Sequence, residues 1–246
     1  MLIIKSCLLN KYPEVCFGFS TKVGLNRKAP YYFNLSNSVG DVKEVVFQNR
    51  KVFFRKLGLT EKTVAAQKQV HGDGVQFVEE GTYCGESDAM ITDKPNLGLA
   101  ISSADCPAIF IYDTNKKIIA AVHSGWRGSQ KKILLKVLKK LQQEYGCEPS
   151  NLAAYIAPSI SQRNYEVGEE VASLFDEKYS IKKNSKFLLD LKQINADIMF
   201  SFGLKRKNVQ VSSLCTYEMK DLLHSFRRDG EKSGRAMGII SLRAAR

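Results

Sequence analysis

The chain has 246 residues, of which 44% are hydrophobic and 25% charged, and this composition is typical of globular proteins rather than of disordered, fibrous or coiled-coil chains. Lysine and arginine number 37 against 25 acidic residues, which gives a formal net charge of +12. Because the basic residues form short, dispersed groups without interleaved aromatic residues, we expect a solvated surface rather than a nucleic-acid interface.

The N-terminal segment lacks the pattern of a secretory signal, because Lys5 interrupts its apolar run and no basic region precedes that run. The longest weakly charged stretch, 97–112, contains Asp105 and Pro107, so no segment is predicted to cross a membrane. The six cysteines form no C-x-x-C pair and are expected to be reduced thiols. These patterns predict a soluble, cytoplasmic protein.

The predicted elements mix helices and strands without strict alternation. Residues 24–41, which are rich in glycine, asparagine and proline, are expected to form an irregular loop. In chain order, the hydrophobic patterns predict a helix over 42–57, strands over 64–66, 75–78, 97–101, 108–112 and 118–122, a helix over 131–145 capped by Gly146, a strand over 152–156, helices over 169–177 and 191–202, and a strand over 209–211. We therefore predict an α/β or mixed α+β class, in which one domain over 1–246 forms a layered sandwich with a mixed sheet flanked by helices.

Two of the three histidines and one cysteine lie in loops beside glycine and acidic residues: His71 in QVHG, Cys106 in SSADCP and His123 in HSGWRG. If strands 108–112 and 118–122 form a hairpin with a two-residue turn, Cys106 faces His123 with Cβ atoms about 5 Å apart. A thiolate at about 2.3 Å and an imidazole at about 2.0 Å then reach one metal ion. With His71 as third ligand, one position stays open, as in catalytic zinc sites. The alternative is an ordinary buried thiol with structural histidines.

The segments QVHG (69–72), SDA (87–89), ADCP (104–107) and HSGWRG (123–128) resemble those of the laccase-domain proteins, once labelled polyphenol oxidases and now assigned as purine nucleoside phosphorylases. Weaker matches, such as SGR at 233–235, follow the family order over nearly the whole chain. The resemblance implies a mixed α/β fold and a zinc site formed by His71, Cys106 and His123. It also implies phosphorolysis of adenosine, inosine, guanosine and methylthioadenosine, with some adenosine deamination. Departures from the family pattern, such as Val23 and Phe226 in place of glycine and tyrosine, remove none of the implied ligands.

Phosphorolysis requires donors for the phosphate anion, for which three arginines are candidates: Arg50, Arg127 and Arg228. Asn34 and Gln69 are candidates for hydrogen bonds to the ribose or the base. Asp105, or else Asp73, is expected to carry a proton beside the three ligands, so that Asp105 joins them as a catalytic candidate. In deamination, a metal would lower the pKa of bound water toward about 7 and deliver hydroxide to the purine.

Other functions use the same residues. A conventional laccase is excluded, because a multicopper oxidase needs roughly ten histidine ligands and the chain has three histidines. A single copper with polyphenol oxidase activity stays open, since copper binds nitrogen and sulfur ligands more tightly than zinc does. Cys106 opposite His123 also fits the nucleophile and base of a cysteine-type hydrolase. The family resemblance adds a peptidoglycan-precursor editing factor as a further alternative, because the family also contains members linked to that activity.

We therefore predict a metal-dependent purine nucleoside phosphorylase with an adenosine deaminase side activity. Its cofactor is expected to be zinc, with copper as the alternative. Its partners are expected to be purine nucleosides and phosphate, with neither nucleic acid nor a membrane, and the protein is expected to be a monomer or a weak dimer.

Overall fold

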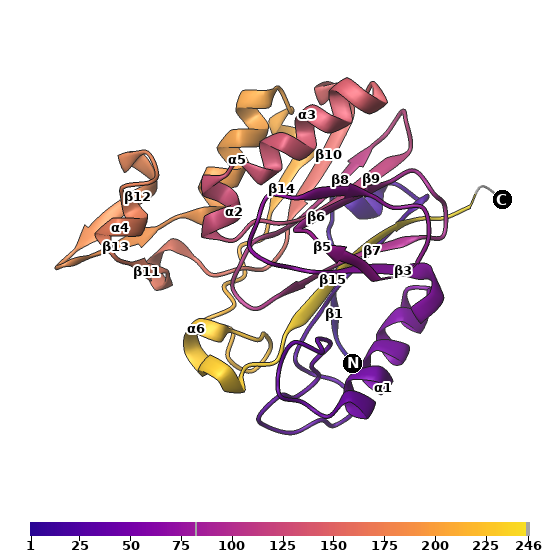
Figure 1. Ribbon diagram of the computed structural model, residues 1–246, viewed down its shortest axis with the longest axis horizontal. Coiled ribbons are helices and arrows are strands. Elements are labelled where there is room, and N and C mark those ends of the chain that lie inside the picture. The colour runs from indigo at the N-terminus through magenta and orange to yellow at the C-terminus, as the bar shows by residue number, and fades with distance from the viewer. Residues whose placement is uncertain (82, 245–246) are drawn as a thin grey trace.

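The computed structural model describes residues 1–81 and 83–244, which form two six-stranded sheets and one small sheet (Figure 1). In spatial order, the first sheet contains β1 (Ile3–Ile4), β2 (Val15–Ser20), β15 (Ala236–Leu242), β7 (Gly98–Ser103), β3 (Val64–Lys68) and β5 (Tyr83–Glu86). The second contains β14 (Val209–Val211), β10 (Leu152–Ile156), β8 (Ala108–Asp113), β9 (Ile118–His123), β6 (Ala89–Thr92) and β4 (Val75–Phe77). Both sheets combine parallel and antiparallel pairs, so both are mixed.

Side chains of the two large sheets face each other across a shared core. Phe17 of the first sheet packs edge-to-face against Phe110 and Tyr155 of the second, with ring centroids 4.9 and 5.3 Å apart. Because successive side chains of a strand point to opposite faces, Ile109 and Ile111 of β8 lie on the outer face of the second sheet. The strand pattern therefore supplies two apolar surfaces, one for the core and one for helices.

Helices cover the outer faces of both sheets (Figure 1). The apolar sides of α3 (Ile133–Tyr145) and α5 (Leu191–Phe202) bury the outer face of the second sheet. On the first sheet, α1 (Lys43–Lys56) packs Phe53 and Phe54 against Ile239 of β15. The result is a four-layered helix–sheet–sheet–helix sandwich, and the predicted fold class is confirmed. No helix within the described part of the chain is long and apolar enough to span a membrane.

A smaller unit of three antiparallel strands projects beside α5 (Figure 1). It contains β11 (Glu166–Val167), β13 (Lys186–Leu189) and β12 (Ser180–Lys183), together with α4 (Glu169–Ala172). The helix predicted over 169–177 is wrong, because α4 ends at Ala172 and the chain forms a short 3-10 turn, Glu177–Tyr179, before β12.

The hairpin of β8 and β9 differs from its prediction in register. His123 pairs with Ala108, not with Cys106, because four residues rather than two connect the paired Asp113 and Ile118. Asp113 Oδ1 accepts hydrogen bonds from Asn115 N at 2.8 Å and Lys116 N at 2.7 Å, which stabilises the longer turn. A shift of two residues keeps each side chain on its predicted face, so Cys106 still lies at the same sheet edge as His123.

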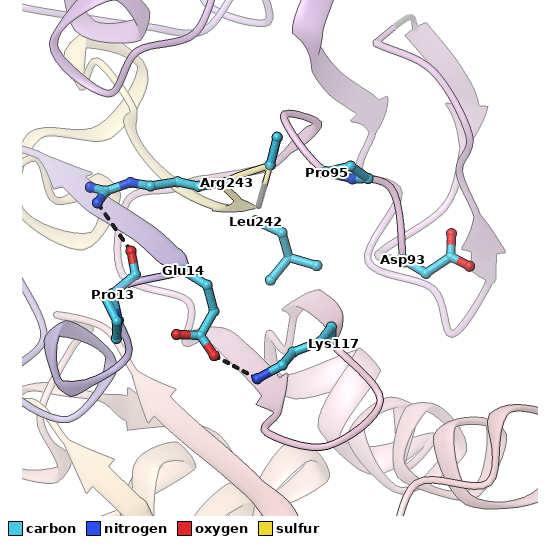
Figure 2. A pocket seen from close by; sticks show the side chains of 8 residues that line it. Pro13, Glu14, Asp93, Pro95, Lys117, Leu242 and Arg243 are labelled. Atoms are coloured by element: carbon cyan, nitrogen blue, oxygen red, sulfur yellow. Dashed lines mark hydrogen bonds and ion pairs between the residues drawn. The ribbon is translucent and has the colours of Figure 1, made fainter. Parts of the chain in front are cut away.

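The two ends of the sandwich differ. At the turn end of the hairpin, a cavity of about 720 Å³ has Leu242 at its centre, and Lys117 Nζ contacts Glu14 Oε1 at 2.7 Å (Figure 2). Arg243 Nη1, which also lies in the wall of this cavity, donates to the Pro13 carbonyl at 3.0 Å (Figure 2). The loops that carry His71, Cys106 and His123 lie at the opposite end of these strands.

Candidate metal centre

Two loops and the end of a strand bring His71, Cys106 and His123 together, with their ligand atoms all within 4.8 Å of one another. His71 lies between β3 and β4, Cys106 between β7 and β8, and His123 ends β9. The two imidazole rings meet edge-to-face with centroids 4.9 Å apart. His123 is buried, Cys106 half-buried and His71 exposed, so the cluster opens toward solvent on the side of His71.

Asp88, which the sequence analysis did not select as a site residue, orients two of the three candidate ligands. Its Oδ1 accepts from His71 N at 3.1 Å and contacts His123 Nδ1 at 2.7 Å. Its Oδ2 accepts from Val70 N at 3.1 Å and from Gly72 N at 2.7 Å. These bonds hold His71 in its left-handed conformation, with φ at 57°. They also leave Nε2 of His123 as the nitrogen available to a metal ion.

The charges in the cluster favour a thiolate. Burial by itself opposes ionisation of Cys106, but the imidazoles of His123 and His71 outweigh it and lower the pKa of the thiol. Burial likewise opposes protonation of His123, but Cys106 and Asp88 outweigh it and raise the pKa of that imidazole. The thiolate is the form of cysteine that binds metals.

The donor set fits a metal ion. One sulfur and two imidazole nitrogens, with a carboxylate behind one ring, are ligands typical of zinc and copper sites. Gly125 permits their close approach, because a Cβ at this position would lie 2.9 Å from Cys106 Sγ and 3.3 Å from His71 Cδ2. If these three residues held a four-coordinate ion, one coordination position would remain for a substrate or water.

A cavity of about 340 Å³ adjoins the ligands. The other lining residues are mostly polar: Ser36, Ser38, Gln67, Lys68, Gln69, Ser102, Ser103, Ala104, Phe226 and Arg235. Gln67 Nε2 and Ser102 Oγ are buried, and within the described residues neither has a hydrogen-bond partner. A volume in the range of small-molecule sites and unsatisfied polar atoms in its wall favour a small polar ligand.

Gln69 and Asn34 make bonds within the protein. The amide of Gln69 lines the cavity and pairs with the backbone of Ser102, at 2.8 Å in both directions. Asn34 is buried and its Oδ1 accepts from Ser36 N at 3.0 Å and from Arg235 N at 2.9 Å. Asn34 therefore shapes one wall of the cavity from behind.

The two aspartates expected to carry a proton are also bound elsewhere. Asp105 Oδ1 accepts from Thr216 Oγ1 at 2.6 Å, and its Oδ2 accepts from Arg227 N at 2.7 Å. The first bond ties the loop of Cys106 to the segment after β14 (Val209–Val211), and the second ties it to the start of α6 (Phe226–Asp229). Asp73 forms an ion pair with Lys136 of α3.

None of the three arginines expected to bind phosphate lines this cavity. Arg50 Nε donates to the Leu35 carbonyl at 2.8 Å. The guanidinium of Arg228 donates to backbone carbonyls of the 216–223 segment and to the neighbouring carboxylate. Arg127 is exposed and lies over the ring of Trp126, 4.2 Å from its centroid. The arginine in the cavity wall is Arg235, whose SGR segment the sequence analysis had noted only as a family match.

Comparisons with known proteins agree along nearly the whole chain. The family model described as multi-copper polyphenol oxidoreductase laccase matches residues 16–243. A purine nucleoside phosphorylase of Bacteroides thetaiotaomicron is 30% identical over 95% of this chain and 94% of its own length. The purine nucleoside phosphorylase YfiH of Shigella flexneri is 31% identical over 98% of both chains.

Solved structures give the same result for the fold. The crystal structure of a hypothetical protein YfiH from Bacillus licheniformis has a TM-score of 0.91 at 28% identity and covers 95% of this chain and 94% of its own. YlmD from Geobacillus stearothermophilus has a TM-score of 0.91 at 25% identity, with 97% of this chain and 94% of its own covered.

Proposed function

The chain belongs to the multi-copper polyphenol oxidoreductase laccase family, and from this membership and the names of its relatives we propose that it is a purine nucleoside phosphorylase. The observation that carries the proposal is the meeting of His71, Cys106 and His123 beside a polar cavity. We do not extend the multi-copper activity in the family's description to this chain, because three histidines are too few for several copper centres.

The proposed reaction takes adenosine, inosine, guanosine or methylthioadenosine with hydrogenphosphate. The C1′–N9 bond of the nucleoside breaks and its electron pair goes to the purine. An oxygen of the phosphate forms the new bond to C1′, and the proton of the hydrogenphosphate ends on the purine. The products are the free base and ribose 1-phosphate, or its methylthio analogue.

We propose that the metal is zinc and that Cys106 Sγ, a ring nitrogen of His71 and Nε2 of His123 would bind it. When bound, zinc supplies a Lewis acid and lowers the pKa of coordinated water toward about 7, which is the chemistry that adenosine deamination requires. The protein's own contributions are separate from the metal. Asp88 fixes the ring of His123 and the loop of His71, and the polar residues Gln67 and Ser102 line the cavity that would receive the nucleoside.

The test is an assay of the purified chain with each nucleoside, with and without phosphate, in which ribose 1-phosphate and free base are measured. We expect phosphate-dependent release of base that is lost with a chelator and restored by zinc. Absence of phosphate-dependent cleavage from the zinc-loaded protein with all four nucleosides contradicts the proposal. Metal analysis of the same preparation distinguishes zinc from copper.

Cys106→Ala separates a metal ligand from a nucleophile. We expect bound zinc and phosphorolysis to fall to background together, because two neutral imidazoles bind divalent ions less tightly without the thiolate. Cys7→Ala is the matched control, since Cys7 is exposed and lies in the N-terminal segment, away from the segments that carry the three candidate ligands. A Cys106→Ala protein that keeps its zinc but loses activity favours the cysteine-type hydrolase instead.

A further inference from the structure

Arg235 places a positive charge in the cavity wall with no acidic partner. Its side chain is half-buried, and among the described residues no carboxylate oxygen lies within 4 Å of its guanidinium nitrogens. The other cation in the wall, Lys68, is neutralised by Glu86 at 2.7 Å. Asp105, Cys106 and Glu231 act on this charge from a distance without forming an ion pair with it. A partly desolvated charge that lacks a direct ion pair favours a ligand that brings negative charge.

The guanidinium of Arg235 has a free binding edge. Nη1 donates to the carbonyls of Ser233 at 2.6 Å and Gly234 at 3.2 Å, and the group lies 5.2 Å from the ring centroid of Phe226. Within the described residues, no hydrogen bond uses Nε or Nη2. These two nitrogens form the side of the guanidinium that binds two oxygens of a phosphate or carboxylate at once.

The backbone holds Arg235 beside two serine hydroxyls. Arg235 N donates to Asn34 Oδ1 at 2.9 Å, and Leu35 N donates to the Arg235 carbonyl at 3.1 Å. The same Asn34 oxygen accepts from Ser36 N, and Ser36 Oγ lies 2.8 Å from Ser38 Oγ. One amide therefore fixes the arginine and the serine loop relative to each other, and all three side chains line the cavity.

We propose that Arg235 binds the phosphate co-substrate through Nε and Nη2, with Ser36 and Ser38 as further donors. Its role in turnover rests on the proposed phosphorolysis, whereas the binding of phosphate does not. This arrangement puts the anion on the Arg235 side of the cavity and leaves Gln67 and Ser102 to the nucleoside. Arg235 takes the phosphate-binding role that the sequence analysis expected of Arg50, Arg127 or Arg228, since none of those three lines the cavity.

The first test uses inorganic phosphate alone. We expect phosphate to raise the Tm of the wild-type protein and to bind measurably in calorimetry. Arg235→Gln should bind it about ten- to a hundredfold more weakly, because hydrogen bonds to charged groups contribute about 1.5–3 kcal/mol. Arg235→Lys keeps the charge but not the two-pronged geometry, and should fall between the two.

Arg206→Gln is the matched control. Arg206 also lies over a phenylalanine ring, 4.7 Å from the centroid of Phe200, but it belongs to the 3-10 turn Arg206–Asn208 that follows α5 and does not line the cavity. Its phosphate affinity should equal that of the wild type. Circular dichroism and Tm without phosphate establish that each variant is folded, and a folded Arg235→Lys supplies the answer if Arg235→Gln does not fold.

The outcomes separate this inference from the proposed function. Phosphate binding that is lost in Arg235→Gln without nucleoside cleavage in the wild type supports the anion site and overturns the phosphorylase. Cleavage in the wild type with an unchanged KM for phosphate in Arg235→Gln overturns the anion site and leaves the phosphorylase. Wild-type protein that shows no phosphate binding also overturns the inference.

Discussion

Asp88→Asn tests how the carboxylate of Asp88 supports the candidate metal centre without altering the three candidate ligands. All four groups that contact the Asp88 carboxylate, three backbone N–H groups and the imidazole Nδ1 of His123, serve as donors there. The two oxygens share these donors equally. An asparagine has one carbonyl oxygen and one NH2 group, so in either orientation two donors face the NH2 group. No rotation of the amide restores the pattern.

The expected magnitude follows from that count. Two buried donors without acceptors cost about 1–3 kcal/mol each, so the free energy of unfolding of the metal-free protein should fall by about 2–6 kcal/mol. Loss of the carboxylate behind a histidine ligand also weakens metal binding, typically by about ten- to a hundredfold. Both effects are expected from one substitution that leaves His71, Cys106 and His123 themselves unchanged.

Two measurements check this prediction: urea unfolding of the metal-free protein and zinc affinity by competition with a chelating dye. Asp93→Asn is the matched control, because Asp93 is exposed and its one ion pair within the described residues is a 3.4 Å contact with the neighbouring Lys94. It should change neither quantity. If Asp88→Asn binds zinc within about twofold of the wild type, the carboxylate does not orient His123 as we describe.

Local sequence patterns predicted the elements whose ends carry their own signals. The helix expected over 191–202 matches α5 residue for residue, because Asp190 caps its start and Gly203 ends it in a left-handed conformation. The scarcity of histidine likewise directed attention to His71 and His123. The hairpin register could not be read in this way, because it depends on how Asp113 folds the turn.

Two site residues were missed because their role arises from distant segments. Asp88 matters through donors 16 to 35 residues away, which share no periodicity with it. Arg235 is fixed by Asn34, 201 residues earlier, so neither residue alone indicates the cavity wall that they form. β15 was also not predicted, and there Gly238 allows the ring of Phe110 from the other sheet to approach within 2.4 Å of where a Cβ would lie.

Two predictions concern stability away from the metal centre. Tyr112→Phe removes a hydroxyl that donates to Glu14 Oε1 at 2.5 Å and accepts from Lys117 Nζ at 2.9 Å. The free energy of unfolding in urea should therefore fall by about 1–3 kcal/mol, while the zinc affinity stays unchanged. An unchanged free energy of unfolding would contradict this prediction. His224 predicts a loss of stability in mild acid. Burial lowers its pKa from 6.5 to about 3, the nearby cations Lys22 and Arg235 act in the same direction, and Asp229 opposes them. Below pH 6.5 the imidazole of His224 therefore binds a proton in the unfolded chain but stays neutral in the folded chain. The free energy of unfolding falls as the pH falls toward 3. Between pH 7.5 and 5.5 this costs about 1.4 kcal/mol, a figure set by the unfolded pKa, since the folded pKa lies far below 5.5. His224→Gln should lose less stability than the wild type over that interval, by about this amount, when both metal-free proteins are unfolded in urea at the two pH values. Equal losses in the two proteins would show that His224 takes up its proton equally well in the folded chain, and the argument from its burial would be wrong.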